Sequence, residues 1–212
     1  MKQILVYGDS LTWGIIPDTR QRLNFHDRWP GVLETHLNKK DRVRVIENCL
    51  NGRRTAWEDP FKPGRNGLDG IQQVIEMHSP LKLVIILLGT NDFQSMHPHT
   101  AWHAASGIEA LVKAVHRAPI EPGMPVPAVL VVVPPLIQQP RGLIADKFQD
   151  AEHKCLGLDK RYNEVCNRLE CDFFDSNTVI RPSSVDGIHL DKTDHHALGQ
   201  VLAKEVAAII GR

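Results

Sequence analysis

The stretch LVIILLGTND, residues 83–92, joins six consecutive apolar residues to a polar tetrapeptide. Its apolar part is continuous rather than alternating, which is typical of a strand buried on both faces of a parallel sheet. Similar runs lie at residues 3–7 and 128–133, and weaker strand candidates lie at 43–47 and 171–174. The sequence therefore predicts a mostly parallel central sheet of about five strands.

Helical patterns separate these runs. Apolar residues recur at helical spacing within residues 29–38, 68–77, about 100–117 and 158–169, and most clearly within 197–210. Strands that alternate with helices predict an α/β fold, a three-layer α/β/α sandwich with right-handed crossovers. At 212 residues, the chain is expected to form a single domain over residues 1–212.

The charge balance argues against polyanionic partners. Lys plus Arg and Asp plus Glu number 25 each, and no run of like charge occurs, so we expect no binding to nucleic acid or to a membrane surface. The first apolar run is too short for a signal peptide or a membrane span, which predicts a cytoplasmic protein. The four cysteines form no C-x-x-C pair and are expected to be free thiols.

Polar motifs follow three of the predicted strands. Gly8-Asp9-Ser10 comes after the first run, Asn51-Gly52 after the second candidate, and Gly89-Thr90-Asn91-Asp92 after residues 83–88. Ligands of open α/β sheets bind beyond the carboxyl ends of the strands. We therefore expect these motifs to meet at one site.

Ser10 is the candidate nucleophile, and the segment 185–190 supplies what it needs. A serine hydroxyl is weak unless an imidazole takes its proton and a carboxylate orients that imidazole. Asp186 and His189 lie three residues apart, with Gly187 between them, just ahead of the last helix. Contact between His189 and Ser10 would complete a catalytic triad.

Acyl transfer also requires donors for the developing oxyanion. The candidates for this oxyanion hole are the backbone N–H groups of Ser10 and Gly52 and the side-chain amide of Asn91. A glycine at position 52 lets the backbone approach a substrate without a Cβ in the way.

Four short blocks give the chain a family resemblance. The blocks are GDSLTWG at 8–14, NG at 51–52, GTND at 89–92 and DGIHL at 186–190. Their order is similar to that of the four blocks of the SGNH hydrolase superfamily, the GDSL esterases and lipases. Together with VVPP at 132–135, they resemble the bacterial arylesterase and acyltransferase branch.

The resemblance implies an SGNH hydrolase domain with a flavodoxin-like sheet that acts as a serine carboxylester hydrolase. Ser10 would be the nucleophile, His189 the general base and Asp186 its partner, with Ser10, Gly52 and Asn91 as the oxyanion donors. It implies no metal and no cofactor, a small-molecule ester as substrate and, from its relatives, a homo-oligomer. Short-chain aryl or alkyl esters are the expected substrates, with acyl transfer or perhydrolysis as possible side reactions.

The substrate pocket is harder to place. Trp13 and Ile15 beside the first block, Phe93 beside the third and Ile188 inside the fourth are the candidate substrate-binding residues. The chain departs from the family in Arg53 and Arg54, which follow Gly52 and are expected to bring positive charge to the mouth of the site. The long connection at residues 134–157 is expected to act as a lid or a substrate wall.

Other functions are also compatible with the sequence. Within the superfamily, the chain could be a carbohydrate O-acetyl esterase, a lysophospholipase or a thioesterase. More remote hypotheses are a non-catalytic small-molecule-binding α/β module and a phosphatase with Asp9 as nucleophile, although Asp9 is expected to cap the first helix instead. His99 and His103 have a spacing that permits joint metal ligation, but no third ligand is evident, and we predict no metal site.

Overall fold

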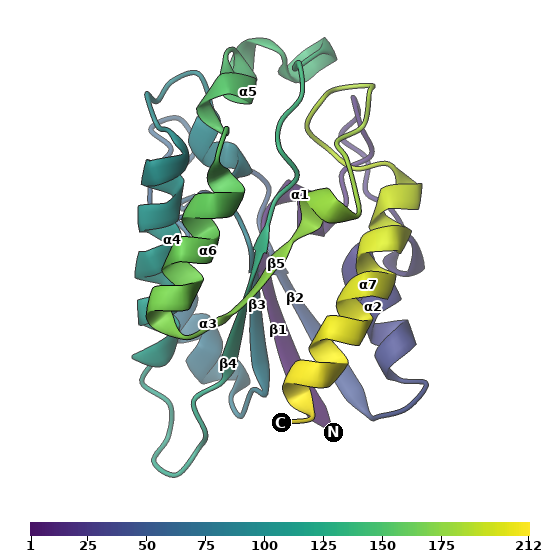
Figure 1. Cartoon of the computed structure of the whole chain (residues 1–212), viewed down its shortest axis with the longest axis vertical. Coiled ribbons are helices and arrows are strands. Elements are labelled where there is room, and N and C mark those ends of the chain that lie inside the picture. The colour runs from purple at the N-terminus through teal and green to yellow at the C-terminus, as the bar shows by residue number, and fades with distance from the viewer.

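A computed structural model describes all 212 residues and contains one five-stranded sheet in the order β2-β1-β3-β4-β5 (Figure 1). Every neighbouring pair of strands is parallel. The strands are β1 (Lys2–Gly8), β2 (Val43–Cys49), β3 (Leu83–Leu87), β4 (Ala128–Val133) and β5 (Asp172–Asp175). The predicted mostly parallel sheet of about five strands is confirmed.

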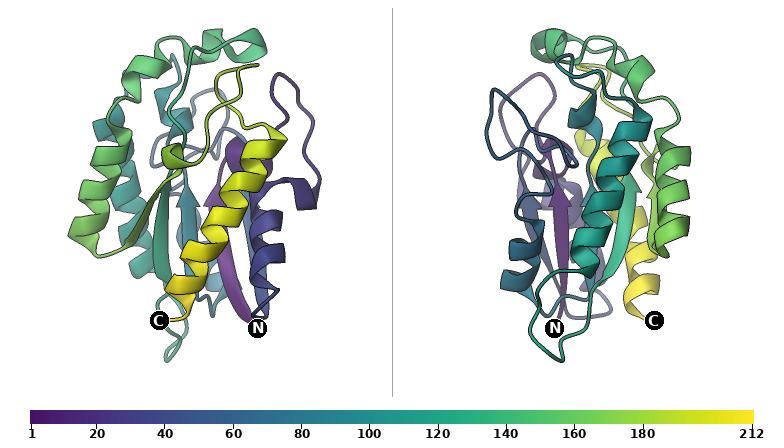
Figure 2. Two further views of the ribbon diagram at one scale, coloured as in Figure 1. Left: turned by 45° about the vertical axis from the view of Figure 1, so that its right-hand side comes forward. Right: turned by 90° about the vertical axis from the view of Figure 1, so that its left-hand side faces the viewer.

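Helices cover both faces of this sheet. Helices α2 and α7 pack against one another on one face, and α3, α4 and α6 cover the other (Figures 1 and 2). The α-helices are α1 (Ser10–Trp13), α2 (Trp29–Leu37), α3 (Ile71–His78), α4 (Ala101–His116), α5 (Ala151–Lys154), α6 (Leu158–Leu169) and α7 (Lys192–Ile210). The 3-10 turns are η1 (Phe25–Asp27), η2 (Thr90–Phe93), η3 (Gly142–Ile144), η4 (Asp146–Phe148) and η5 (Ser176–Thr178). The three-layer α/β/α sandwich is therefore as predicted.

The two faces of β3 explain its continuous apolar sequence. Leu83, Ile85 and Leu87 pack into the core beneath α2 and α7, whereas Val84 and Ile86 pack into the core beneath α3, α4 and α6. Because successive side chains of a strand point to opposite faces, both sets must be apolar when both faces are covered. The fold therefore follows from the buried strands at its centre.

Helix α3 begins at Ile71, three residues later than the sequence pattern predicts. A turn occupies the preceding residues, in which the Asn66 side-chain oxygen accepts a hydrogen bond from the backbone N–H of Leu68. Asparagine competes for backbone donors in this way, and Gly70, with a φ of +125°, lies outside the helical region directly before Ile71.

The parallel strands bring their following loops to one edge of the sheet. In Figure 1 both termini lie at the bottom, and the loops that follow β1, β2 and β3 lie at the opposite end. This edge carries all the polar motifs named above. None of the helices is both long enough and apolar enough to cross a membrane.

Candidate active site

Ser10 is the first residue of α1, directly beyond the end of β1. As predicted, Asp9 caps this short helix, and its carboxylate accepts a hydrogen bond of 2.9 Å from the N–H of Leu11. The sharp turn between strand and helix requires Gly8, since a Cβ there would lie 2.3 Å from the Thr12 hydroxyl oxygen. The local sequence thus presents Ser10 at the edge of the sheet.

Ser10, His189 and Asp186 come together across the chain. The Ser10 Oγ lies 3.2 Å from His189 Nε2, and His189 Nδ1 lies 2.7 Å from Asp186 Oδ2. An imidazole that donates from Nδ1 to a carboxylate has an unprotonated Nε2, which can accept a hydroxyl proton. The geometry is that of a hydrogen-bonded serine, histidine and aspartate relay.

The environment of Asp186 keeps it ionised. Burial alone would raise the pKa of Asp186, but the hydrogen bond from His189, the charge of that imidazole and the N–H groups of Ile188 and His189 outweigh burial. The result is a pKa of about 2. A further N–H, from Asp18, reaches the same carboxylate at 3.2 Å. Asp186 is therefore an anion at neutral pH and can stabilise an imidazolium.

Two backbone donors beside Ser10 are free. Neither the N–H of Ser10 nor that of Gly52 donates to any acceptor within the protein, and both residues line the same cavity. Gly52 has a φ of +85°, a left-handed conformation that favours glycine. Two N–H groups are thus available to a negatively charged oxygen at this point.

The amide of Asn91, the third predicted donor, is held by its neighbours. Its Nδ2 donates to Asp9 Oδ2 at 2.9 Å and to the backbone oxygen of Arg53 at 3.1 Å. Its Oδ1 accepts from Gln94 Nε2 at 2.7 Å, and Gln94 Oε1 accepts in turn from Arg54 at 2.6 Å. A chain of hydrogen bonds therefore runs from a buried arginine to the residue beside Ser10 and fixes the orientation of the Asn91 amide.

A second buried aspartate joins the loops after β2 and β3. Asp92 accepts hydrogen bonds from the backbone N–H of Thr55, at 2.9 Å, and from the Thr55 hydroxyl, at 2.5 Å. Burial raises the pKa of Asp92 to about 7, and these hydrogen bonds only partly offset it. Burial likewise raises the pKa of Asp9 to about 6. The two acids that support this part of the site therefore favour the neutral form far more than Asp186 does.

A cavity of about 50 Å³ lies over Ser10, and all four motifs contribute to its walls. Of the candidate substrate-binding residues, Ile15 and Ile188 line it, whereas Trp13 and Phe93 do not. Phe93 packs into the core, and the ring of Trp13 lies beneath the guanidinium of Arg22, 4.8 Å from its centroid. The structure therefore brings two of the four predicted side chains to the cavity.

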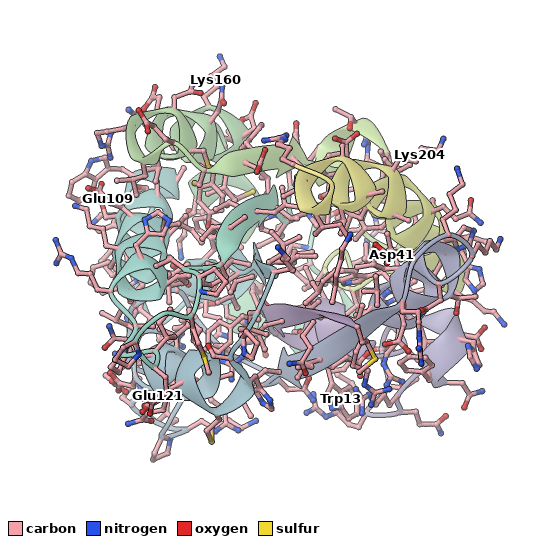
Figure 3. The ribbon with its side chains drawn as sticks, turned by 90° about the horizontal axis from the view of Figure 1, so that it is seen from below. Trp13, Asp41, Glu109, Glu121, Lys160 and Lys204 are labelled. Atoms are coloured by element: carbon pink, nitrogen blue, oxygen red, sulfur yellow. The ribbon has the colours of Figure 1, made fainter.

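A larger groove of about 600 Å³ lies between the ends of α2 and α7, at the other end of the sheet. Asp41 and Lys204, which both line it, are labelled in the view from below in Figure 3. None of the four motifs contributes to this groove, so its position gives it no part in the site around Ser10.

The comparisons with known proteins agree with this geometry. Residues 6–197 match the GDSL-like lipase/acylhydrolase family. The chain belongs to this family. Its members are acylhydrolases, which makes this chain a carboxylic ester hydrolase.

Solved structures resemble this acylhydrolase over its whole length. An aryl esterase from M. smegmatis is 35% identical with a TM-score of 0.94, and the match covers 99% of this chain and 100% of that one. A carbohydrate acetylesterase family member from Sinorhizobium meliloti is 35% identical with a TM-score of 0.94, over 100% of both chains. A lipase/acylhydrolase from Enterococcus faecalis, 18% identical with a TM-score of 0.68 over 98% of this chain and 96% of its own, shares the fold. A sequence comparison with curated proteins gives no significant match.

The two arginines after Gly52 do not bring charge to the mouth of this acylhydrolase. Arg53 donates to the backbone oxygens of Gly8 and Asn48 and stacks on Tyr7, with 3.9 Å between its Cζ and the ring centroid. Arg54 is fully buried and forms an ion pair of 3.3 Å with Asp59. The prediction of positive charge from this pair is wrong, because both side chains are turned inward to hold backbone oxygens.

The positive charge at the cavity comes from other residues of the acylhydrolase. Arg20, Lys62 and Lys147 line it, although none belongs to a sequence motif. Lys147 lies in the long connection at residues 134–157, which also contributes Ile144 and Phe148 to the cavity wall. The connection at residues 134–157 thus forms part of the cavity wall, as expected. Its length was the only feature of the sequence that indicated this role. Nothing in the sequence pattern identified Arg20 or Lys62.

The histidine pair considered for metal binding has another arrangement. The rings of His99 and His103 stack with centroids 5.2 Å apart, and His99 also stacks on His97 at 4.6 Å. No three His, Cys, Asp or Glu side chains of the acylhydrolase converge in a metal-binding group. These histidines therefore contribute to packing between the loop that precedes α4 and α4 itself.

Proposed function

We propose that this chain hydrolyses short-chain carboxylic esters through an acyl-enzyme formed on Ser10, with His189 as general base and Asp186 as its orienting partner. The observation that carries the proposal is the hydrogen-bonded series from Ser10 Oγ to His189 to Asp186, placed beside two free backbone N–H groups. We further propose that residues 1–212 act as one hydrolase domain.

Acylation begins when Ser10 Oγ attacks the ester carbonyl carbon while its proton passes to His189 Nε2. The carbonyl oxygen becomes an oxyanion, and the free N–H groups of Ser10 and Gly52 are positioned to donate to it. Asn91 becomes the third donor when its Nδ2 exchanges its bond of 3.1 Å with the Arg53 carbonyl for the oxyanion. Collapse of this intermediate breaks the ester C–O bond, and the imidazolium protonates the departing alcohol.

Deacylation repeats these steps with water as nucleophile. His189 removes a proton from the water, the same donors hold the second oxyanion, and Ser10 leaves with the proton returned by the imidazolium. An alcohol or a peroxide in place of water would give acyl transfer or perhydrolysis. The ionised Asp186 stabilises the imidazolium in both halves of the cycle.

The size of the cavity supports a short acyl group. At about 50 Å³ it is far smaller than the several hundred Å³ of pockets that enclose drug-sized ligands. Aryl acetates are the first substrates to test, given the resemblance to an aryl esterase. The equally similar carbohydrate acetylesterase favours sugar acetates as the second candidate, and both carry the same acyl group.

The decisive experiment compares wild type with Ser10→Ala on p-nitrophenyl acetate, butyrate and octanoate. We expect kcat to fall by about 10⁴-fold or more in the variant, because no other group can form the acyl-enzyme. In wild type, kcat/KM should fall from acetate to octanoate. Ser106→Ala, which removes a hydroxyl from α4, is the matched control. Full activity in Ser10→Ala would refute the mechanism.

Two further predictions belong to this proposal. We expect a homo-oligomer, which light scattering of the purified protein will test. We also expect a cytoplasmic location, which fractionation of the producing cells will test.

A further inference from the structure

Three cations from three separate loops line the cavity over Ser10. Arg20 comes from the loop after α1, Lys62 from the loop between β2 and α3, and Lys147 from η4. No Asp or Glu lines this cavity. We call Arg20, Lys62 and Lys147 the cationic mouth. In a chain of zero net charge, this local excess of one sign requires an explanation.

The side chains of the cationic mouth have no partners within the protein. None of them takes part in any ion pair of the chain. By contrast, Arg53 and Arg54 nearby are fully occupied with backbone oxygens and with Asp59. The three cations therefore retain their full capacity to bind an anion.

The cations also affect one another. Burial lowers the pKa of Lys62, and the charges of Arg65 and Arg20 lower it further. Partial burial lowers the pKa of Lys147, whose side chain still reaches solvent; Asp59 opposes this shift, while Lys62 adds to it. Asp59 is itself buried and paired with Arg54, so it offsets only part of the positive charge of the mouth. An anion placed between these cations would relieve their repulsion.

The two parts of an ester occupy different places in this site. The cavity of about 50 Å³ over Ser10 matches a short acyl group in size. We therefore expect the alcohol portion to extend towards solvent, where Arg20 and Lys147 are exposed. Any charge on the alcohol portion would lie among the three cations.

Resting on the proposed function, we propose that the preferred substrates are short-chain esters whose alcohol portion carries an anionic group, a carboxylate or a phosphate, held by Arg20, Lys62 and Lys147. The anion is recognised by an arginine, which binds carboxylate and phosphate oxygens in pairs, and by two lysines acting as point charges. The class includes acetylated hydroxy acids and acetylated phosphate esters.

The test uses aryl acetates that differ only in charge. These are 4-acetoxybenzoate, 4-acetoxyphenyl phosphate, the neutral 4-acetoxybenzamide and the cationic 4-acetoxyphenyl-trimethylammonium. Each kcat/KM is divided by the rate constant for reaction of the same ester with imidazole, a neutral nucleophile, which removes differences between the leaving groups without adding a charge effect. We expect at least one anionic ester to exceed the neutral one by about 10-fold in 20 mM salt and the cationic ester to be the poorest. The advantage should shrink severalfold in 0.5 M salt, where the Debye length falls below about 5 Å.

Variants then assign the effect to the cationic mouth. Arg20→Gln, Lys62→Gln and Lys147→Gln should each lower the ratio of anionic to neutral kcat/KM by about 3-fold, and the triple variant should bring it near 1. Because the ratio compares two esters in one variant, effects common to both esters cancel. Lys160→Gln is the control, since Lys160, labelled in Figure 3, lies on α6 and does not line the cavity. Of the two anionic esters, the one with the larger ratio of kcat/KM to that of the neutral ester identifies the natural anionic group, a carboxylate or a phosphate.

The results separate this inference from the proposed function. Ser10-dependent hydrolysis with equal normalised rates for anionic and neutral esters, or a ratio that survives in the triple variant, overturns the inference alone. Hydrolysis that persists in Ser10→Ala overturns the proposed function and the inference with it.

Discussion

Two hydrogen-bond networks meet at the cavity of this acylhydrolase. Each contains a buried aspartate, and the pKa values of the two aspartates are shifted in opposite directions. The loop before α7 holds Asp186, whose pKa is about 2. The paired loops after β2 and β3 hold Asp92, whose pKa is about 7. Both side chains are almost completely shielded from solvent, and Asp92 lies deeper in the protein than Asp186.

Depth of burial accounts for part of the difference in pKa, and the donors and charges around each carboxylate account for the rest. Asp186 accepts hydrogen bonds from the backbone N–H groups of Asp18, Ile188 and His189, and from an imidazole that can carry a positive charge. Asp92 accepts hydrogen bonds only from Thr55. The charge of Arg54 lowers its pKa and the charge of Asp9 raises it, but burial has the largest effect. An ionised acid at position 186 can support an imidazolium, whereas Asp92 needs only to tie two loops together.

Asp186→Asn should have the largest effect. The amide cannot stabilise a protonated His189 and favours the wrong tautomer, so we expect kcat on p-nitrophenyl acetate to fall by about 10⁴-fold. The depressed pKa of Asp186 contributes stability above pH 4 that is lost as the pH falls towards 2, so the variant should also lose about 2 kcal/mol at pH 7. Asp191→Asn is the control. The Asp191 side chain, in the same loop, accepts a hydrogen bond only from the Ser183 hydroxyl, so this variant should remain active. Equal kcat values for these two variants would contradict the role of Asp186.

Asp92→Asn should change stability rather than chemistry. Because the pKa of Asp92 is raised in the folded state, Asp92 contributes fully to the stability of the wild type below about pH 4. This contribution to the free energy of unfolding is lost as the pH rises through 7. The variant does not titrate, so its free energy of unfolding relative to wild type should rise by about 4 kcal/mol between pH 4 and pH 8. Urea unfolding over that range measures the difference. In the variant, the Thr55 N–H keeps an oxygen acceptor and the Thr55 hydroxyl can accept from the new amide.

The contrast fails if the stability difference between Asp92→Asn and wild type does not vary with pH. It also fails if kcat for this variant drops as far as it does for Asp186→Asn. We expect kcat to stay within about fivefold of wild type, since Asp92 does not line the cavity.

Gln94→Glu should have the smallest effect and tests whether the second network also serves catalysis. A glutamate still accepts from Arg54 but cannot donate to Asn91 Oδ1, so the Asn91 amide is free to turn its nitrogen away from Asp9. We expect kcat to fall by about 10-fold with little change in KM, somewhat less than the loss of a complete oxyanion donor. Gln73→Glu on the exposed side of α3 is the control. A rise in KM at constant kcat would show that Gln94 serves binding rather than orientation of the amide.

The strands and the motif positions could be predicted because they depend on local sequence. Continuous apolar runs identified the buried strands, and residues 128–133 matched a strand residue for residue. In a parallel sheet all the following loops lie at one edge, so the meeting of Ser10, Gly52 and Asn91 at one cavity followed from the sheet itself.

The directions of individual side chains could not be predicted in the same way. Arg53 and Arg54 have the composition of a charged surface pair, yet the loop after β2 turns both inward towards backbone oxygens. Phe93 follows the third block directly but lies on the core side of η2. One backbone turn decides such directions, and a residue pattern does not record it.

The sequence by itself determined the sandwich, the four polar blocks and the residue types of the proposed relay, because apolar periodicity and short motifs are properties of contiguous residues. Only the tertiary structure decided that the pKa of Asp186 is lowered to about 2 while that of Asp92 is raised to about 7, and that Arg20, Lys62 and Lys147 line the cavity. These properties depend on which groups approach from distant loops. Burial and electrostatic interactions are set by neighbours in space, and only the packed fold supplies those neighbours.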